Sequence, residues 1–448
     1  MNLLDERARL VEAALGKAPA DLVIRGGNLV NVHTREIYPA DVVIQGKRIA
    51  AVLEAGSPAG AESEVIRADG MVLVPGFIDP HIHIESSAVT VKEYARVVVP
   101  RGVTTVAEDP HEIANVLGIP GFELFFAEAK ALPLRLLLRV PGKVPGISAD
   151  LETSGGEITL DQTKELLARE AAVCLAGDIN PNLLIRGDRA QLEKIAFTQS
   201  LRKTVSGQSP GLQGSALNAF IAAGPEDSHV SENAAEVLDI IRHGLRALIT
   251  HREDFFRIGD YRELAELIRA GQIDTRMLCF CSDDVSPHLL LEQGSIDARV
   301  RLAIRYGMDP VTAIQMATIN VADLLRLDRD LGSISPGKIA DIAILSDLEK
   351  VTVDRVLFEG KLAAQDGRLV QEPPPFEYPD WAKNTIHIQR PLDPADIPIR
   401  VDESQAEVSA RVIQMGMPKE ERVVRLPARN GSVLPDPEQD VLSVAVLD

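Results

Sequence analysis

The amino-acid sequence predicts an α/β protein, a (β/α)8 barrel of the TIM type with a small β-sandwich domain built from both flanks of the barrel. Three observations support this fold class. Apolar, strand-like runs alternate with helical stretches between residues 71 and 284. Polar side chains gather where these runs end. Short strands separated by turn residues occur on both sides of this region.

The middle of the chain is expected to hold eight strands. They are 71–84, 102–109, 134–141, 172–180, 203–210, 226–231, 247–253 and 276–284. The helical stretches between them carry start and stop signals. Thr159 and Gln162 form a capping-box pattern, and the stretch that begins at Asp260 ends at Gly271. A parallel barrel surrounded by helices accounts for this alternation.

We expect four regions along the chain. Residues 1–20 form an N-terminal amphipathic helix, and residues 21–72 combine with 331–370 in the composite β-sandwich. Residues 73–330 form the barrel, and 371–448 are a C-terminal extension that we expect to be an incomplete second domain. In the first flank, Gly26-Gly27 and Gly46-Lys47 each indicate a hairpin turn.

Composition excludes several classes of partner. The net charge is −19, and only 4% of residues are aromatic, which disfavours nucleic acid and anionic membranes as partners. The N-terminus lacks a signal-peptide layout, and no apolar run is long enough to cross a bilayer, so we expect a cytoplasmic protein. Three sparse cysteines argue against a disulfide framework. Cys279 and Cys281 share one face of a strand, which favours two buried small side chains over metal ligation.

The segment FIDPHIHIESS, residues 77–87, places two histidines at alternate positions of an expected strand. The side chains of His81 and His83 would point to the same side, so both imidazoles can reach one point. Two neutral imidazoles suit a divalent transition metal but hold it poorly alone. His229 and Asp283 each end another run and are the natural further ligands. Such a metal makes a water molecule acidic near neutral pH, and Asp283 is placed to accept its proton.

Other interpretations of the polar residues remain open. His81 and His83 can also serve as hydrogen-bonding residues at a strand end, although the pairing favours a metal site. Asp109 either orients a ligand histidine or caps the following helix. His251 faces either the pocket or the solvent. His83-Ile84-Glu85 matches half of the zinc nucleobase deaminase signature, but its P-C-x-x-C half is absent.

Several long motifs resemble the adenine deaminases of bacteria and archaea, within the amidohydrolase superfamily. They include PGFIDPHIHIESS (75–87), GVTTVAEDPHEIANVLG (102–118), SPGLQGSALNAFIAAGPEDSH (209–229), SDD (282–284) and LGSISPGKIADIAIL (331–345). The resemblance covers about residues 20 to 445. It implies the barrel with its composite β-sandwich. It also implies hydrolytic deamination of adenine to hypoxanthine and ammonia, in purine salvage or adenine catabolism.

The resemblance also implies a set of site residues. The metal ligands are His81, His83, Asp178, His229 and Asp283, and the ions, one or two, are manganese or iron, with zinc as an alternative. Asp283, Glu112 and His111 are the catalytic residues that it implies, the last two from the DPHE loop. Glu85, Asp109 and Asp284 are expected to contact the substrate. The partner is a small purine, and by analogy with other barrels we expect a homo-oligomer.

Three positions depart from the family pattern. Asp178 stands in place of a glutamate, Gln208 in place of a fifth-strand histidine, and Val230 where a glutamate follows the sixth-strand histidine. An amide oxygen is a weaker ligand than imidazole for a borderline metal. These departures leave two alternatives: a related amidohydrolase acting on another cyclic amidine or amide, or a catalytically impaired homologue with a binding role.

Overall fold

The computed structural model describes residues 3–58, 62–146, 151–177, 179–250, 258–387, 390–391, 393, 396–413 and 421–444. The chain forms two compact units, Met1–Glu377 and Tyr378–Asp448. Among the described residues, the first unit contains a parallel barrel and a nine-stranded sheet, and the second contains a small antiparallel sheet.

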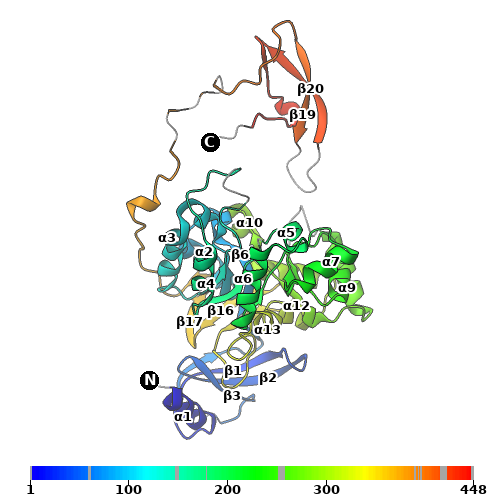
Figure 1. Ribbon diagram of the computed structural model, residues 1–448. Coiled ribbons are helices and arrows are strands. Elements are labelled where there is room, and N and C mark those ends of the chain that lie inside the picture. The colour runs from blue at the N-terminus through cyan, green and yellow to red at the C-terminus, as the bar shows by residue number, and fades with distance from the viewer. Residues whose placement is uncertain are drawn as a thin grey trace. The chain divides into compact units, whose positions relative to one another are not determined.

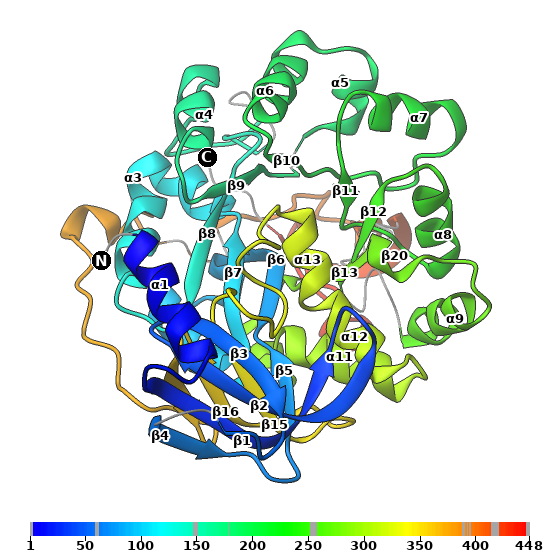
Figure 2. The ribbon, with the colours of Figure 1, turned by 90° about the horizontal axis from the view of Figure 1, so that it is seen from below.

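Eight successive parallel strands of the first unit form the barrel wall (Figure 2). Within the described chain they are β6 (Phe77–His83), β7 (Val103–Glu108), β8 (Arg135–Val140), β9 (Ala172–Leu175), β10 (Thr204–Val205), β11 (Asp227–Ser228), β12 (Arg246–Ile249) and β13 (Leu278–Phe280). The N–H of Glu226 donates to the carbonyl of Val205 at 2.8 Å and links the two halves of the wall. The two-residue strand β14 (Asp283–Asp284) pairs with β6 and closes the ring. The prediction of a (β/α)8 barrel is confirmed.

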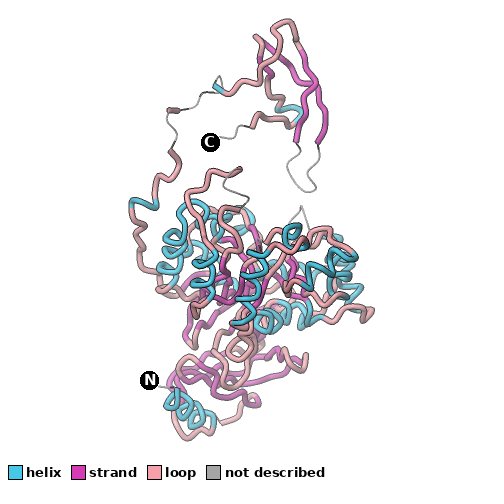
Figure 3. The backbone as a smooth tube through the Cα atoms, in the orientation of Figure 1, coloured by secondary structure: helices cyan, strands magenta, loops and turns pink. Residues whose placement is uncertain are grey.

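Helices surround this wall and cover its lower end in Figure 2, and Figure 3 draws them in cyan. They are α2 (Val91–Val98), α3 (His111–Ala129), α4 (Leu160–Leu167), α5 (Pro181–Ile185), α6 (Arg189–Ser200), α7 (Gly214–Ala222), α8 (Ala234–Arg242), α9 (Ile258–Arg269), α10 (Pro287–Glu292), α11 (Ile296–Arg305), α12 (Pro310–Met316) and α13 (Ile319–Leu324). Helix α4 begins at the predicted capping box, in which Thr159 and Gln162 satisfy each other's backbone N–H groups.

The barrel interior is apolar below the strand ends. Small and branched side chains from β6 to β13 pack there against Val321, Ala322 and Leu324 of α13. Cys174, Cys279 and Cys281 are buried in this cluster, as predicted for Cys279 and Cys281. This packing holds the wall rigid, so that the side chains at its rim have fixed positions.

Both flanks of the barrel contribute to one nine-stranded sheet, drawn below the barrel in Figure 1. From the first flank come β1 (Ala20–Asn31), β2 (Glu36–Gln45), β3 (Arg48–Glu54), β4 (Glu62–Arg67) and β5 (Val72–Pro75), and from the second β15 (Ile342–Asp347), β16 (Thr352–Phe358), β17 (Lys361–Gln365) and β18 (Arg368–Leu369). β5 pairs in parallel with β1 and antiparallel with β15. Thus the apolar run 71–84 is shared between this sheet and the barrel, which begins after Gly76. The exact domain boundaries given above stay a prediction.

The predicted hairpin at Gly26-Gly27 is wrong. Both glycines lie inside the single strand β1, where the register with β2 shifts between Ile24 and Gly27. Gly26 has a φ of 75°, and a Cβ there would lie 2.5 Å from Asp69 Oδ1. The glycines therefore permit a bulge that bends the strand, rather than a turn that reverses it. The hairpin expected at Gly46-Lys47 does connect β2 to β3.

Two smaller parts complete the fold. Helix α1 (Leu3–Ala14) packs Leu10 and Ala13 against the nine-stranded sheet. In the second unit, β19 (Glu407–Ile413), β20 (Glu421–Arg429) and β21 (Ser432–Val433) form an antiparallel sheet. Of the helices within the described ranges, none combines the length and the apolar character that crossing a bilayer requires.

Candidate metal centre

Both histidines of the HxH motif are buried at the end of β6. His81 is 1% exposed and His83 is 7% exposed. Their ring centroids are 4.8 Å apart, with the planes at 83°. Two imidazoles that share one side of a strand end are thus present as the spacing predicts.

His229 and Asp283 approach the same point from other strands. The His229 ring centroid lies 4.2 Å from that of His81. Asp283 Oδ1 lies 3.3 Å from His81 Nε2 and 3.7 Å from His83 Nε2. One ligand atom from each of His81, His229 and Asp283 lies within 4.8 Å of the others. His81, His229 and Asp283 therefore face one shared position at the carboxyl ends of the barrel strands, and His83 borders it beside Asp283.

The closure of the barrel explains how Asp283 reaches the histidines. In β14, Asp283 pairs with Ile82 and Asp284 with His83, so the last strand lies directly beside the first. Asp283 has a φ of 54°, a left-handed conformation that residues other than glycine seldom adopt. Such a backbone persists only where the surroundings impose it, and it occurs most often at functional sites.

The residues present fit a divalent cation. Both ring nitrogens of His81 are buried: within the described residues Nδ1 has no hydrogen-bond partner, and Nε2 faces Asp283 Oδ1 at 3.3 Å. Orphaned buried nitrogens are costly unless another ligand satisfies them. Imidazole and carboxylate together suit zinc, iron or manganese. His81, His229 and Asp283 therefore form a group that could hold a divalent cation.

The charges in this cluster favour ligands in their metal-binding forms. Burial lowers the pKa of His81 well below its usual value, and the neighbouring His229 and Arg139 lower it further. Burial would raise the pKa of Asp283, but the hydrogen bond from His81 and the charges of the histidines outweigh it, so that this pKa is well below its usual range. A neutral imidazole and an ionised carboxylate are the forms that bind cations.

His83 is oriented by the segment that follows β7. Its Nδ1 lies 2.9 Å from the carbonyl oxygen of Asp109 and 3.1 Å from Glu112 Oε2. Burial would lower the pKa of His83, but the hydrogen bond to Glu112 and the charges of Asp109 and Asp283 raise it well above its usual value. Because both neighbours of Nδ1 are oxygen acceptors, Nδ1 carries a proton, and Nε2 faces Asp283. Of the two roles considered for Asp109, its carbonyl orients a histidine, whereas α3 has no side-chain cap at Pro110.

The other predicted residues line the mouth of this cluster. His81, His83 and Asp109 form a second group of ligand atoms within 4.8 Å of one another, and His83, Glu112 and Asp284 form a third. The Glu112 side chain is 46% exposed. His111 begins α3 and lies against Gly146, since a Cβ on that glycine would be 3.0 Å from His111 Nε2. These residues stand between the buried ligands and the solvent.

Glu85 belongs to a buried carboxyl pair that the sequence reading did not find. Glu85 Oε1 accepts the N–H of Ile113, and both carboxyl oxygens of Glu108 accept the N–H of Ile84. Burial raises the pKa of both Glu85 and Glu108, and the charge of Glu85 raises that of Glu108 further. The pair joins the end of β6 to the first turn of α3, which carries His111. Glu108 is the last residue of β7, next to Asp109. Its place at a strand end is the feature of the sequence that could have marked it as a site residue.

Gln208, one of the positions that depart from the family pattern, and Gly177 both lie beside His229. Gln208 Nε2 is 3.3 Å from His229 Nε2, so the amide contacts the imidazole. A Cβ on Gly177 would lie 2.9 Å from His229 Cε1, so only glycine leaves room for the ring where it stands. Asp178, predicted as a ligand, and His251 lie outside the described residues.

A second buried network lies beneath the histidines. Arg139 is fully buried and donates to the carbonyl of Pro80 at 2.5 Å and to Ser206 Oγ at 2.6 Å. Ser206 Oγ donates to Asp227 Oδ1 at 2.6 Å. Burial raises the pKa of Asp227 to about 6, against the opposing charge of Arg139. This network ties the strand of His81 to the strand of His229.

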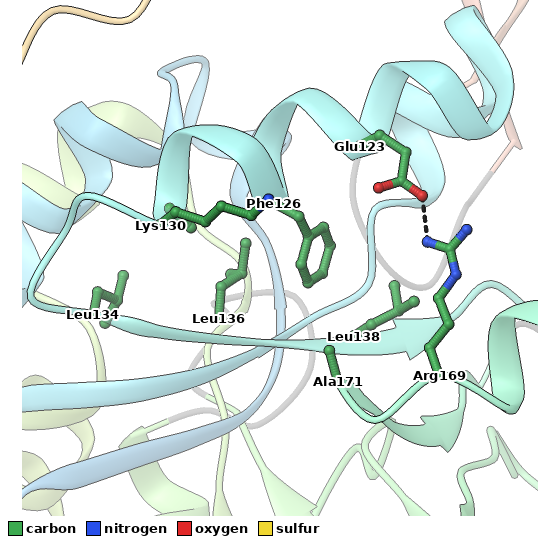
Figure 4. A pocket seen from close by; sticks show the side chains of 9 residues that line it. Glu123, Phe126, Lys130, Leu134, Leu136, Leu138, Arg169 and Ala171 are labelled. Atoms are coloured by element: carbon green, nitrogen blue, oxygen red, sulfur yellow. Dashed lines mark hydrogen bonds and ion pairs between the residues drawn. The ribbon is translucent and has the colours of Figure 1, made fainter. Parts of the chain in front are cut away.

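The surface cavity between α3 and β8 belongs to another part of the barrel. Figure 4 shows Phe126, Leu136 and Leu138 facing this hollow of about 370 Å³. An ion pair between Glu123 and Arg169 borders it. It is lined by none of the residues predicted for the site, and its Glu123 carboxylate is paired with Arg169.

Comparisons with known proteins agree with this geometry. The model of the amidohydrolase family matches residues 72–182 and 226–363. An adenine deaminase of Mesorhizobium japonicum is 38% identical over 98% of this chain and 73% of its own length. Adenine deaminase 3 of Rhizobium meliloti is 39% identical over 98% of the chain and 74% of its length. In structure, the chain is similar to a beta-aspartyl dipeptidase of Fervidobacterium islandicum, with a TM-score of 0.58, 16% identity, and 80% and 98% of the two chains covered.

Proposed function

This chain belongs to the amidohydrolase family and, within it, to the adenine deaminases, and we propose that it hydrolyses adenine to hypoxanthine and ammonia at the cluster of His81, His83, His229 and Asp283. The observation that carries the proposal is the convergence of these side chains from β6, β14 and the end of β11. The substrate is a small purine, as the names of the relatives indicate for those proteins.

We propose that His81, His83, His229 and Asp283 hold a divalent cation. When bound, this cation supplies Lewis-acid chemistry and makes a water molecule acidic near neutral pH. Manganese or iron is the proposed ion, as the family resemblance implies, and zinc also suits the nitrogen and oxygen donors. Asp178 is proposed as a further ligand from the sequence.

The residues then divide the movement of protons between them. Asp283, ionised because its pKa is low, accepts a proton from the attacking water at a carboxylate oxygen. Water oxygen bonds to C6 of adenine, and the bond from C6 to the amino nitrogen breaks, so that ammonia leaves. The ring nitrogen and the departing amine each need one proton, and Glu112 and His111 at the mouth supply them. Water loses two protons, one to Asp283 at the attack and one when the C6 hydroxyl becomes the carbonyl of hypoxanthine, and these restore the two donors. Glu85, Asp109 and Asp284 are proposed to orient the ring.

The test measures ammonia release from adenine by the full chain purified from a manganese-supplemented culture. We expect one ammonia per adenine consumed. Asp283→Asn should slow the reaction by roughly 10²- to 10⁴-fold, the usual contribution of a general base. The matched control is His288→Ala, because the His288 side chain is 72% exposed and pairs only with Glu292 among the described residues.

Two results would contradict the proposal. Activity on other cyclic amidines or amides with none on adenine would assign the site to a different substrate. No activity on any ring, together with less than about a tenth of an equivalent of bound metal, would identify an impaired homologue. We further propose that the protein is a cytoplasmic homo-oligomer that acts in purine salvage or adenine catabolism. Cell fractionation would test the location, and light scattering would test the oligomeric state.

A further inference from the structure

Asp79 is a buried carboxylate that the proposed chemistry does not use. It lies on β6, two residues before His81, and its side chain is 0% exposed. Its Oδ1 accepts the backbone N–H of His81 at 3.2 Å and that of Ser282 at 3.1 Å. Ser282 directly precedes Asp283. One carboxylate oxygen therefore joins the segment that carries the first histidine to the segment that carries the aspartate.

The peptide groups around Ser282 are held on both sides. Asp79 accepts the N–H of Ser282. The carbonyl of Ser282 accepts hydrogen bonds from Arg299 Nη2 at 3.3 Å and from Thr250 Oγ1 at 3.3 Å. Its hydroxyl lies 2.8 Å from Ser295 Oγ. Asp79 and Arg299 are both buried and carry opposite charges, so each reduces the cost of burying the other. A main-chain segment fixed by buried charged groups has little freedom to shift.

This anchoring bears on the unusual backbone of Asp283. A residue other than glycine at a φ of 54° keeps that conformation only when neighbouring contacts impose it. Arg299 holds the carbonyl of the peptide immediately before Asp283, and Asp79 holds the N–H of the peptide before that one. If the N–H of Ser282 lost its acceptor, it would be buried without a partner, and the segment would relax to satisfy it.

We propose that Asp79 is a positioning residue that sets the separation between His81 and Asp283 by accepting one N–H from each of their segments. The inference depends on the proposed function, because it takes these two side chains as ligands of one cation. Asp79 itself is not a ligand: within the described ranges it belongs to none of the clusters whose ligand atoms approach within 4.8 Å. Partners that orient metal ligands are usually worth about 10- to 100-fold in metal affinity.

The test titrates Mn²⁺ into the full chain after chelator treatment and follows binding by calorimetry, for three variants of one residue. Asp79→Asn keeps an oxygen at the same place, so the Kd for Mn²⁺ should stay within about threefold of the wild type. Asp79→Glu keeps the charge but moves the oxygens by one methylene, and Asp79→Ala removes them. Both should raise the Kd by roughly 10- to 100-fold.

The matched control is Asp41→Ala in the nine-stranded sheet. Asp41 is likewise 0% exposed and accepts two backbone N–H groups, from Gly26 at 2.8 Å and from Gly56 at 2.9 Å. Its loss should lower the Tm as Asp79→Ala does while leaving the Kd for Mn²⁺ unchanged. If Asp79→Ala does not fold, the Kd values of Asp79→Asn and Asp79→Glu for Mn²⁺ still show whether the position of the oxygen matters.

Three outcomes would overturn the inference. A wild-type Kd for Mn²⁺ in Asp79→Glu together with a raised Kd in Asp79→Asn would mean that Asp79 acts through its charge. Wild-type affinity in both Asp79→Ala and Asp79→Glu would mean that it does not position the ligands. Each of these outcomes leaves the proposed deaminase standing. A wild type that binds no Mn²⁺ would overturn the metal site and this inference together.

Discussion

Replacing Gly177 by alanine should loosen the metal site through a single added methyl group. Gly177 is not among the glycines with positive φ, so alanine suits its backbone, and the effect is steric. The new Cβ would lie 2.9 Å from His229 Cε1. Carbon atoms prefer separations of about 3.5 Å or more, so the ring must retreat by about 0.6 Å. Protein–metal distances tolerate only about 0.2 Å, so this displacement removes His229 from its place as a ligand.

The expected size follows from these distances. Disturbing one ligand should raise the Kd for Mn²⁺ by about 10- to 100-fold, or about 1.4 to 2.7 kcal/mol. Overpacking should also destabilise the fold by about 1–3 kcal/mol. Gly27→Ala provides the control, because its Cβ would lie 2.6 Å from Leu73 in the nine-stranded sheet, away from the site.

The assay combines calorimetric titration of Mn²⁺, thermal unfolding and ammonia release from adenine. Gly177→Ala should bind Mn²⁺ more weakly and release ammonia more slowly. Gly27→Ala should only have a lower Tm. Wild-type affinity in Gly177→Ala, with a Tm lowered as in the control, would show that His229 does not bind the ion from its position against Gly177. The assignment of His229 as a ligand would then be wrong.

Three further predictions concern the ion, the departures from the family pattern and the thiols. Removing the metal with a chelator should lower the Tm and abolish ammonia release, and adding Mn²⁺ at about 100 times its Kd should restore about 2.7 kcal/mol of stability, measured by thermal unfolding. The double variant Gln208→His with Asp178→Glu should raise both bound metal, by elemental analysis, and the deamination rate; no gain would count against the assigned ligands. Burial raises the pKa of Cys174 and of Cys279 to about 12, and that of Cys281 well above its usual value, so none should react with a thiol reagent at pH 8 until denaturant is added, when three should react.

The barrel and the convergence of its ligands could be predicted because both depend on short-range patterns. Alternate positions in one strand place His81 and His83 together without knowledge of the rest of the chain. His229 and Asp283 follow or end other parallel strands, and such ends share one rim. Counting strands and noting which polar residue ends each was therefore enough to name His81, His229 and Asp283, whose ligand atoms lie within 4.8 Å of one another.

What the sequence could not predict depends on register and on contacts between distant residues. The bond from Ser282 to Asp79 spans 203 residues and exists only because β14 lies beside β6 in one particular register. The left-handed backbone of Asp283 could not be predicted, because the position is not occupied by glycine, the residue that usually marks this conformation. At Gly26, local turn chemistry indicated a hairpin, but pairing with β2 over most of β1 outweighs it. Tertiary contacts decided each of these cases.

The nine-stranded sheet also has a consequence for how the protein is made. β5 obtains its partner β15, and β6 obtains β14, only after almost the whole barrel has been synthesised. While the ribosome is still translating the helices between them, the nascent chain carries two uncovered strand edges side by side, and such edges are prone to pair with other chains. The nine-stranded sheet therefore stays incomplete until β15 has left the exit tunnel, after every strand of the barrel.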